Sequence, residues 1–116
     1  MGPLTVTKRR AGSVLIVRVE GELDLHTAPR FRQEVDGELE ASPGLRHLVL
    51  VLGGLSFVDS SGVGALLGRY RQVHQRGGQV VAVGPGPQVR RVLERAGFLR
   101  LVQVCASEEQ ALQRIR

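Results

Sequence analysis

The sequence is poor in several residue types, and each shortage excludes a class of protein. Its one cysteine, Cys105, cannot form an internal disulfide or a metal site built from cysteines. There is no tryptophan, one tyrosine and three phenylalanines, which leaves few rings on which nucleic-acid bases could stack. No apolar run approaches the roughly 20 residues that a membrane span requires. We therefore expect a cytoplasmic protein without a membrane or metal site, in which Cys105 is buried.

Lysine is almost absent, although the chain is basic. Lys8 is the only lysine among 16 basic residues, which outweigh 11 acidic ones to give a net charge of +5. This charge raises the hypothesis of a nucleic-acid-binding domain. However, the arginines are scattered along the chain, Arg69 and Arg71 among them, and several alternate with core residues at helical spacing, as on a solvated face. We predict no direct contact with nucleic acid and keep that function as an alternative.

The order of apolar patterns predicts one α/β domain over residues 1–116. The length suffices for one hydrophobic core and is too short for two domains. Continuous β-branched runs predict buried strands, and an alternating segment predicts an edge strand. Apolar residues three or four apart predict helices, with Thr27 and Ser107 as N-caps and Gly97 as a C-cap. We expect a mixed, mainly parallel sheet of four to five strands with about four helices. The predicted strands are residues 4–8, 13–21, 45–52, 77–84 and 99–104, and the predicted helices include 26–41, 85–98 and 107–116.

The stretch LSFVDSSGVGALLGRYRQ, residues 55–72, leads from an apolar strand into a helix that contains three glycines. At about 100° per residue, an apolar side including Val63 and Leu66 faces the sheet, whereas Ser61, Gly64 and Gly68 gather on the opposite, solvent side. Each glycine costs a helix roughly 1 kcal/mol relative to alanine. The exposed glycines are either neutral sequence drift that the fold tolerates, or they form a flat face that another protein approaches closely. Gly62 lies beside this stripe, where it can allow close backbone contact at the turn.

Ser60 is predicted to be the N-cap of this helix, and Asp59 a residue of the preceding turn. A serine at a helix N-terminus is accessible, and a phosphate there is stabilised by free N–H groups and the helix dipole. A nucleophilic role would require a general base and the sharp strand-to-helix turn called a nucleophile elbow. VDSSGVG does not match the G-x-S-x-G motif of that turn. The sequence brings neither Asp24 nor His26 to Ser60. We therefore expect no enzyme, no catalytic residue and no cofactor, and a site suited to a phosphorylation switch.

Three segments resemble one family. LSFVDSSGVGALLGRYRQVHQRGGQVVAVG (55–84), GELDLHTAPRF (21–31) and PQVRRVLERAGFLRLVQV (87–104) are similar to STAS domains, in particular to bacterial anti-sigma factor antagonists of the stage II sporulation AA type. The resemblance extends from about Val14 to Ile115. It implies a STAS-like fold and a partner-switching role in the regulation of transcription.

The resemblance also implies the partners. An unphosphorylated antagonist binds an anti-sigma factor, which is a serine kinase, and so releases a sigma factor. The kinase phosphorylates the antagonist and ejects it, and a serine phosphatase resets it. The family's phospho-acceptor follows the aspartate and maps to Ser60, and Asp24 maps to a partner-facing loop. A STAS interaction module of a stress-signalling complex is the alternative. The expected partner-binding residues are Asp24, Asp59, Ser60, Ser61, Gly62, Gly64 and Gly68.

Overall fold

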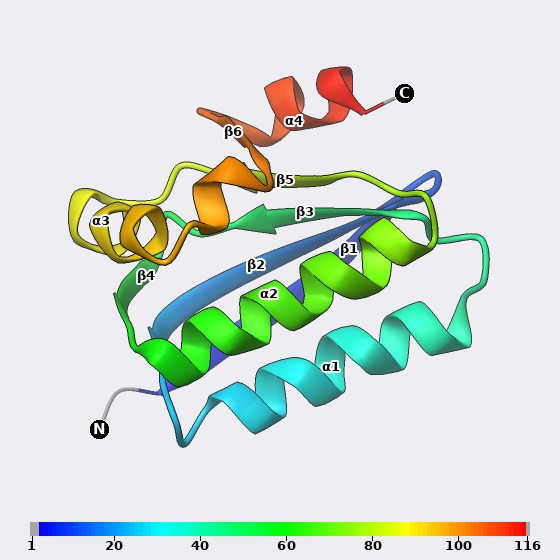
Figure 1. The fold of residues 1–116 in the computed structure, drawn as a ribbon. Helices are drawn as coiled ribbons and strands as arrows, with labels where there is room; N and C mark the ends of the chain where they lie inside the picture. The colour runs from blue at the N-terminus through cyan, green and yellow to red at the C-terminus, as the bar shows by residue number, and fades with distance from the viewer. Residues whose placement is uncertain (1–2, 116) are drawn as a thin grey trace.

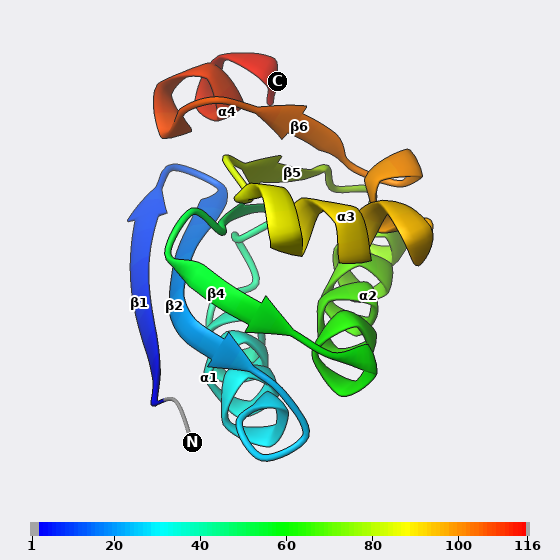
Figure 2. The same cartoon turned by 90° about the vertical axis from the view of Figure 1, so that its left-hand side faces the viewer.

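A computed structural model describes residues 3–115. Within that range one mixed sheet is covered by helices on both faces (Figure 1). Helices α1 and α2 cover one face, α4 covers the other, and α3 lies beside β4 at the end of the molecule seen in Figure 2. The elements are β1 (Leu4–Ala11), β2 (Val14–Leu23), α1 (Ala28–Ala41), β3 (His47–Val51), β4 (Leu55–Val58), α2 (Ser60–Gln75), β5 (Val80–Val83), α3 (Pro87–Arg95), a 3-10 turn (Phe98–Arg100), β6 (Gln103–Cys105) and α4 (Glu108–Arg114).

Strand β2 organises the sheet because it pairs with three neighbours. It runs antiparallel to β1 along one edge, while its other edge pairs in parallel first with β3 and then with β4. The sheet continues from β3 through β5 to β6. The prediction of a mixed, mainly parallel sheet is confirmed, but residues 3–115 hold six strands rather than four to five. The chain after β3 breaks at Gly53 and Gly54, so that β4 becomes a separate strand.

The continuous apolar runs of the strands are explained by two buried faces. On the face under α1 and α2, Leu15 and Leu50 of the strands pack with Phe31 of α1 and Leu66 of α2. On the opposite face a smaller core lies under α4 and includes Cys105, which is buried as predicted. Because alternate strand residues point to opposite faces, both sets must be apolar. Among the described residues, no helix is long and apolar enough to cross a membrane.

Three details of the helices and strands differ from, or refine, the sequence prediction. Thr27 stands at the N-cap of α1, but its hydroxyl donates to the carbonyl of Glu22 instead of capping the helix. The segment 99–104 was predicted to be a strand, yet it starts in the 3-10 turn, and only its end belongs to β6. Gly97 ends α3 with a φ of 81°, in the left-handed region, as the C-cap prediction requires.

Several of the scattered arginines were expected on solvated faces, but Arg69 of α2 does not lie on one. Its side chain is buried between α2 and α1, and its Nε lies 3.1 Å from Oδ1 of Asp36. The Nε–H is not aligned for a hydrogen bond, so the contact is chiefly electrostatic. Burial lowers the pKa of the Arg69 guanidinium, and the charge of Asp36 opposes that shift. Helical spacing alone could not identify this position, because the adjacent helix α1 supplies the compensating charge.

We expect Asp36→Ala to lower the free energy of unfolding by about 3 kcal/mol, because it leaves the buried Arg69 charge without its partner. The double variant Asp36→Leu/Arg69→Met should recover most of this loss, because it removes both charges. Glu94→Ala, which breaks an exposed pair with Arg90, should cost under about 0.5 kcal/mol and serves as the control. Urea denaturation measures all three. Equal losses in Asp36→Ala and the double variant would show that shape, and not charge pairing, matters at this contact.

Candidate functional site

The predicted site residues come together at the carboxyl ends of β2 and β4. These parallel strands end as neighbours, with Leu23 opposite Val58. The loop after β2 and the amino end of α2 after β4 therefore lie side by side, at the end of the sheet that Figure 2 turns toward the viewer. In open α/β sheets this is the edge at which binding sites form.

Asp59, and not Ser60, is the N-cap of α2, which corrects the sequence prediction. Its carboxylate accepts from the backbone N–H of Gly62 through Oδ1 at 2.9 Å and from that of Leu25 through Oδ2 at 3.2 Å. Its own N–H donates to the carbonyl of Leu23 at 3.3 Å. One aspartate therefore caps the helix and fastens the β2–α1 loop to it. Ser60 becomes the first helical residue, because the carboxylate of Asp59 already performs the capping.

Asp24 orders the β2–α1 loop from within. Its Oδ1 accepts from the backbone N–H groups of His26 and Thr27 at 2.9 and 3.0 Å, while its own N–H donates to the Thr27 hydroxyl. These bonds, that from the Thr27 N–H foremost, lower the pKa of Asp24, although partial burial opposes the shift. The carboxylate is thus kept ionised and occupied with its own loop. Asp24 therefore shapes the surface beside Ser60 without contacting it directly.

Gly62 allows the backbone of α2 to approach β2 very closely. A Cβ at this position would lie 2.2 Å from the carbonyl oxygen of Leu23 and 2.7 Å from Cγ2 of Val58. No side chain fits in that space without moving backbone. Close backbone contact at the strand–helix turn, the use predicted for Gly62, is therefore confirmed.

Ser60, Ser61, Gly64 and Gly68 lie on the outward-facing part of α2. Ser60 and Gly64 are exposed, and Ser61 and Gly68 are half-buried. A Cβ at Gly64 or Gly68 would meet nothing within 4 Å, so the fold itself does not require glycine at either position. The hydroxyl of Ser60 makes no hydrogen bond within residues 3–115, and the amides of Ser60 and Ser61 have no intrahelical partner. The predicted exposure of this stripe is confirmed for Gly64, whereas Ser61 and Gly68 are only partly exposed.

Two exposed apolar side chains close in the chain to the ends of β2 and β4 escaped the sequence analysis. Leu25 is 66% exposed, in the loop that Asp59 holds, and Phe57 is 48% exposed in β4, two residues before Asp59. Large apolar residues at such exposure often mark interaction sites when they adjoin one another or a functional group. The exposure of Leu25 could have been inferred from the sequence, because this leucine stands between Asp24 and His26 in a polar turn. Phe57 had no such signal, because LSFV reads as a buried strand.

The loop after β2 brings two polar side chains near the amino end of α2. The loop carrying Asp24 and His26 does lie next to Asp59, a proximity that the sequence did not indicate. Yet Asp24 is engaged by its own loop, and no hydrogen bond joins His26 to Ser60 in the described part of the chain. Across residues 3–115 no group of three or more His, Cys, Asp or Glu is placed to hold a metal ion. Within residues 3–115 the Ser60 hydroxyl is exposed and is hydrogen-bonded to no side chain that could act as a base.

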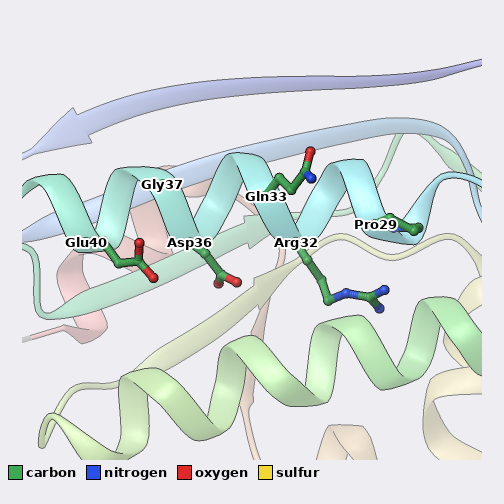
Figure 3. Close-up of a pocket in the computed structure, with 6 residues that line it drawn as sticks. All are labelled: Pro29, Arg32, Gln33, Asp36, Gly37 and Glu40. Atoms are coloured by element: carbon green, nitrogen blue, oxygen red, sulfur yellow. The ribbon is translucent and has the colours of Figure 1, made fainter.

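A hollow of about 500 Å³ lies along α1 and contains none of the predicted site residues. Figure 3 shows Arg32 and Asp36, one turn apart, extending from α1 toward α2. Asp36 is the partner of the buried Arg69, so this side of the hollow belongs to the contact between the helices. The hollow is broad and open, and its charges of both signs are compatible with solvated surface.

Alanine at two glycines of α2 should have opposite effects on stability. Gly62→Ala should lower the free energy of unfolding by about 3 kcal/mol because of the clash with the Leu23 carbonyl. Gly64→Ala should raise it by up to about 1 kcal/mol, because alanine is the better helix former and the space is open. Thermal or urea denaturation of both variants checks this. A destabilised Gly64→Ala would contradict the conclusion that the fold tolerates a side chain there.

Comparison with known proteins gives consistent results. Residues 5–111 match the STAS domain family. The anti-sigma F factor antagonist of Paenibacillus polymyxa is 39% identical over 85% of this chain and 84% of its own length. The anti-sigma-B factor antagonist of Bacillus subtilis is 26% identical over 84% and 86%. The structure of the unphosphorylated anti-sigma factor antagonist SpoIIAA superposes with a TM-score of 0.82 at 28% identity, covering 97% of this chain and 95% of that one. The chain therefore belongs to the STAS domain family, with anti-sigma factor antagonists among its relatives.

Proposed function

We propose that this protein is an anti-sigma factor antagonist that binds a kinase-type anti-sigma factor, releases a sigma factor, and is switched off by phosphorylation of Ser60. The observation that carries the proposal is the position of Ser60. It is exposed, it begins α2, and its hydroxyl is free of hydrogen bonds within residues 3–115 while Asp59 does the capping. The hydroxyl can therefore be modified without removing a bond that holds the helix.

The chemistry requires a kinase supplied by the partner. The Ser60 Oγ attacks the γ-phosphorus of ATP, the bond to the β-phosphate oxygen breaks, and ADP leaves while the serine proton passes to a base on the partner. This chain supplies only the acceptor and its presentation, in accord with the absence of a base beside Ser60 in the described residues. A serine phosphatase reverses the step by hydrolysing the phosphoserine to serine and inorganic phosphate.

The partner would contact what we call the docking surface. It combines small residues, over which another backbone can pass closely, with two exposed apolar side chains that can serve as anchors. Burying a phosphate dianion within such a contact requires its desolvation, which is costly without paired cations. Phosphorylation would therefore eject the partner even though the helix remains intact. The docking surface consists of Leu25, Phe57, Ser60, Ser61, Gly64 and Gly68.

The two aspartates have supporting roles in this proposal. Asp59 sets both the start of α2 and the position of Leu25, and Asp24 keeps the loop between them in one shape. Gly62 contributes by bringing the helix against β2. Asp24, Asp59 and Gly62 would thus affect partner binding by positioning the docking surface.

The similarities favour a sigma F type of pathway, and hence sporulation, over general stress signalling. The relatives named for sigma F are 39% and 35% identical to this chain, and those named for sigma B are 26–27% identical.

Direct nucleic-acid binding is disfavoured by the ion pairs, because seven basic side chains are engaged by carboxylates. These are Lys8, Arg9, Arg10, Arg18, Arg30, Arg69 and Arg90.

Incubation with the cognate anti-sigma factor and ATP should add one phosphate to the wild type, as read by intact mass. Ser60→Ala should remain unmodified and bind the anti-sigma factor persistently, because no phosphate can form at that position. Ser61→Ala is the matched control and should accept phosphate at Ser60. Full phosphorylation of Ser60→Ala, or none of the wild type, would overturn the acceptor assignment.

Gly64→Gln should weaken binding of the unphosphorylated protein to the anti-sigma factor at least tenfold, because a long side chain would stand in the docking surface. Gly37→Gln is the control: Gly37 is also an exposed helical glycine with open space around it, but it lies on α1. Calorimetric titration measures both affinities, and circular dichroism verifies that both variants fold.

The same titration applies to the apolar anchors. Leu25→Ser should weaken binding about tenfold, whereas Leu101→Ser, which alters a leucine of comparable exposure near the other end of α2, should not. Equal affinities for Gly64→Gln and Gly37→Gln, or for the two leucine variants, would exclude this face as the partner's contact.

A further inference from the structure

A second cavity lies far from Ser60, at the carboxyl-terminal half of α2. It is bounded by α2, by the segment that enters β5, and by the segment between the 3-10 turn and β6. Its volume is about 410 Å³. His74 lies 14 residues after Ser60, or about 21 Å along the helix axis at 1.5 Å per residue. Figure 1 shows α2 running from its amino end at β4 to the loop that leads into β5. The cavity therefore does not belong to the docking surface.

One wall of the cavity is aromatic. The rings of Tyr70 and His74, one helical turn apart, stack with their centroids 5.4 Å apart and their planes within 16° of parallel. Tyr70 is half-buried and His74 is exposed, and both line the cavity, so the stacked pair contributes aromatic ring surface to its border. Buried Val80 and Val102 line the cavity as well, and Leu101, 46% exposed, completes an apolar border. Such walls favour a flat, partly apolar ring.

The charge of this cavity is of one sign. Arg100 lines it, and no carboxylate does. Three other hollows, including the one along α1, have Asp36, Glu40 or Glu108 in their walls. Arg100 forms no ion pair within the described residues, and Arg114 reaches the border by donating to Oε1 of Gln103 at 3.4 Å. An anionic group would find a guanidinium there without a competing carboxylate.

We propose that this cavity is a binding site for a small organic anion that carries a flat ring. The ring would lie against Tyr70 and His74, and its carboxylate or phosphate would pair with Arg100. Aromatic carboxylates and nucleoside monophosphates share this chemistry and fit the volume. The site is independent of the proposed antagonist function, because none of its residues belongs to the docking surface.

The test is an NMR titration in which the backbone amide resonances of the full chain are followed as each of four probes is added. Adenosine 5′-monophosphate has ring and charge, benzoate has a smaller ring and a carboxylate, adenosine has only the ring, and inorganic phosphate has only the charge. We expect saturable shifts at Gly78, Gln79 and Gln103 with the monophosphate or with benzoate. The more tightly bound of these two shows whether the cavity prefers a carboxylate or a phosphate beside the ring. Adenosine and phosphate alone should bind at least tenfold more weakly.

Variants separate a built site from general attraction to a basic protein. Arg100→Gln and His74→Ala should each weaken binding about tenfold, and Arg91→Gln, which alters an exposed arginine of α3, should leave it unchanged. Spectra of the free variants verify that the fold is kept. The proposal is overturned if neither ringed anion gives saturable shifts at these amides. It is likewise overturned if phosphate binds as well as the ringed anions, or if Arg91→Gln and Arg100→Gln weaken binding equally.

Discussion

The geometry around Ser60 depends on the direct packing of a helix backbone onto the end of a strand. At Gly62 the separation leaves no room for a methyl group against the Leu23 carbonyl. Asp59 then joins the same two elements by hydrogen bonds to Gly62 and Leu25. With α2 held against β2 in this way, Ser60 and the outward stripe are presented at a fixed distance from the β2–α1 loop. Loosening that contact would displace the part of the docking surface on α2 relative to Leu25.

Much of the architecture could be predicted because it follows from local patterns. The buried strands appear as continuous apolar runs, and the helices appear as apolar residues three or four apart, so the mixed, mainly parallel sheet was predictable. The outward orientation of Gly64 and Gly68 followed from helical geometry alone. The apolar strand expected just before Asp59 is β4, whereas its pairing with β2 beyond the turn at Gly53 and Gly54 could not be predicted from the sequence.

The errors concern features that depend on contacts distant in sequence. Ser60 and Asp59 are both good N-caps, and the choice between them depends on the Leu25 amide, which comes from a loop 34 residues earlier. Arg69 looked solvated because its partner Asp36 lies on another helix. Phe57 looked buried because LSFV reads as a buried strand, and only the assembled sheet shows that its side chain is exposed. Pairings between elements decide these details, and a single sequence does not display them.

The arginine-rich composition becomes intelligible once the ion pairs are placed. Glu108 at the start of α4 is paired with Arg9 of β1 and Arg18 of β2, so one carboxylate joins three elements. Helix α4 has only seven residues, and Ala111 is its one buried residue within the described range. Its attachment therefore relies on this charged contact and on a thin apolar layer. Because local opening free energies differ across a structure, α4 should be the unit with the lowest free energy of opening, below that of the central strands. The valines of the minor core would then become accessible while the larger core under α1 and α2, with Ser60 at its end, stayed folded.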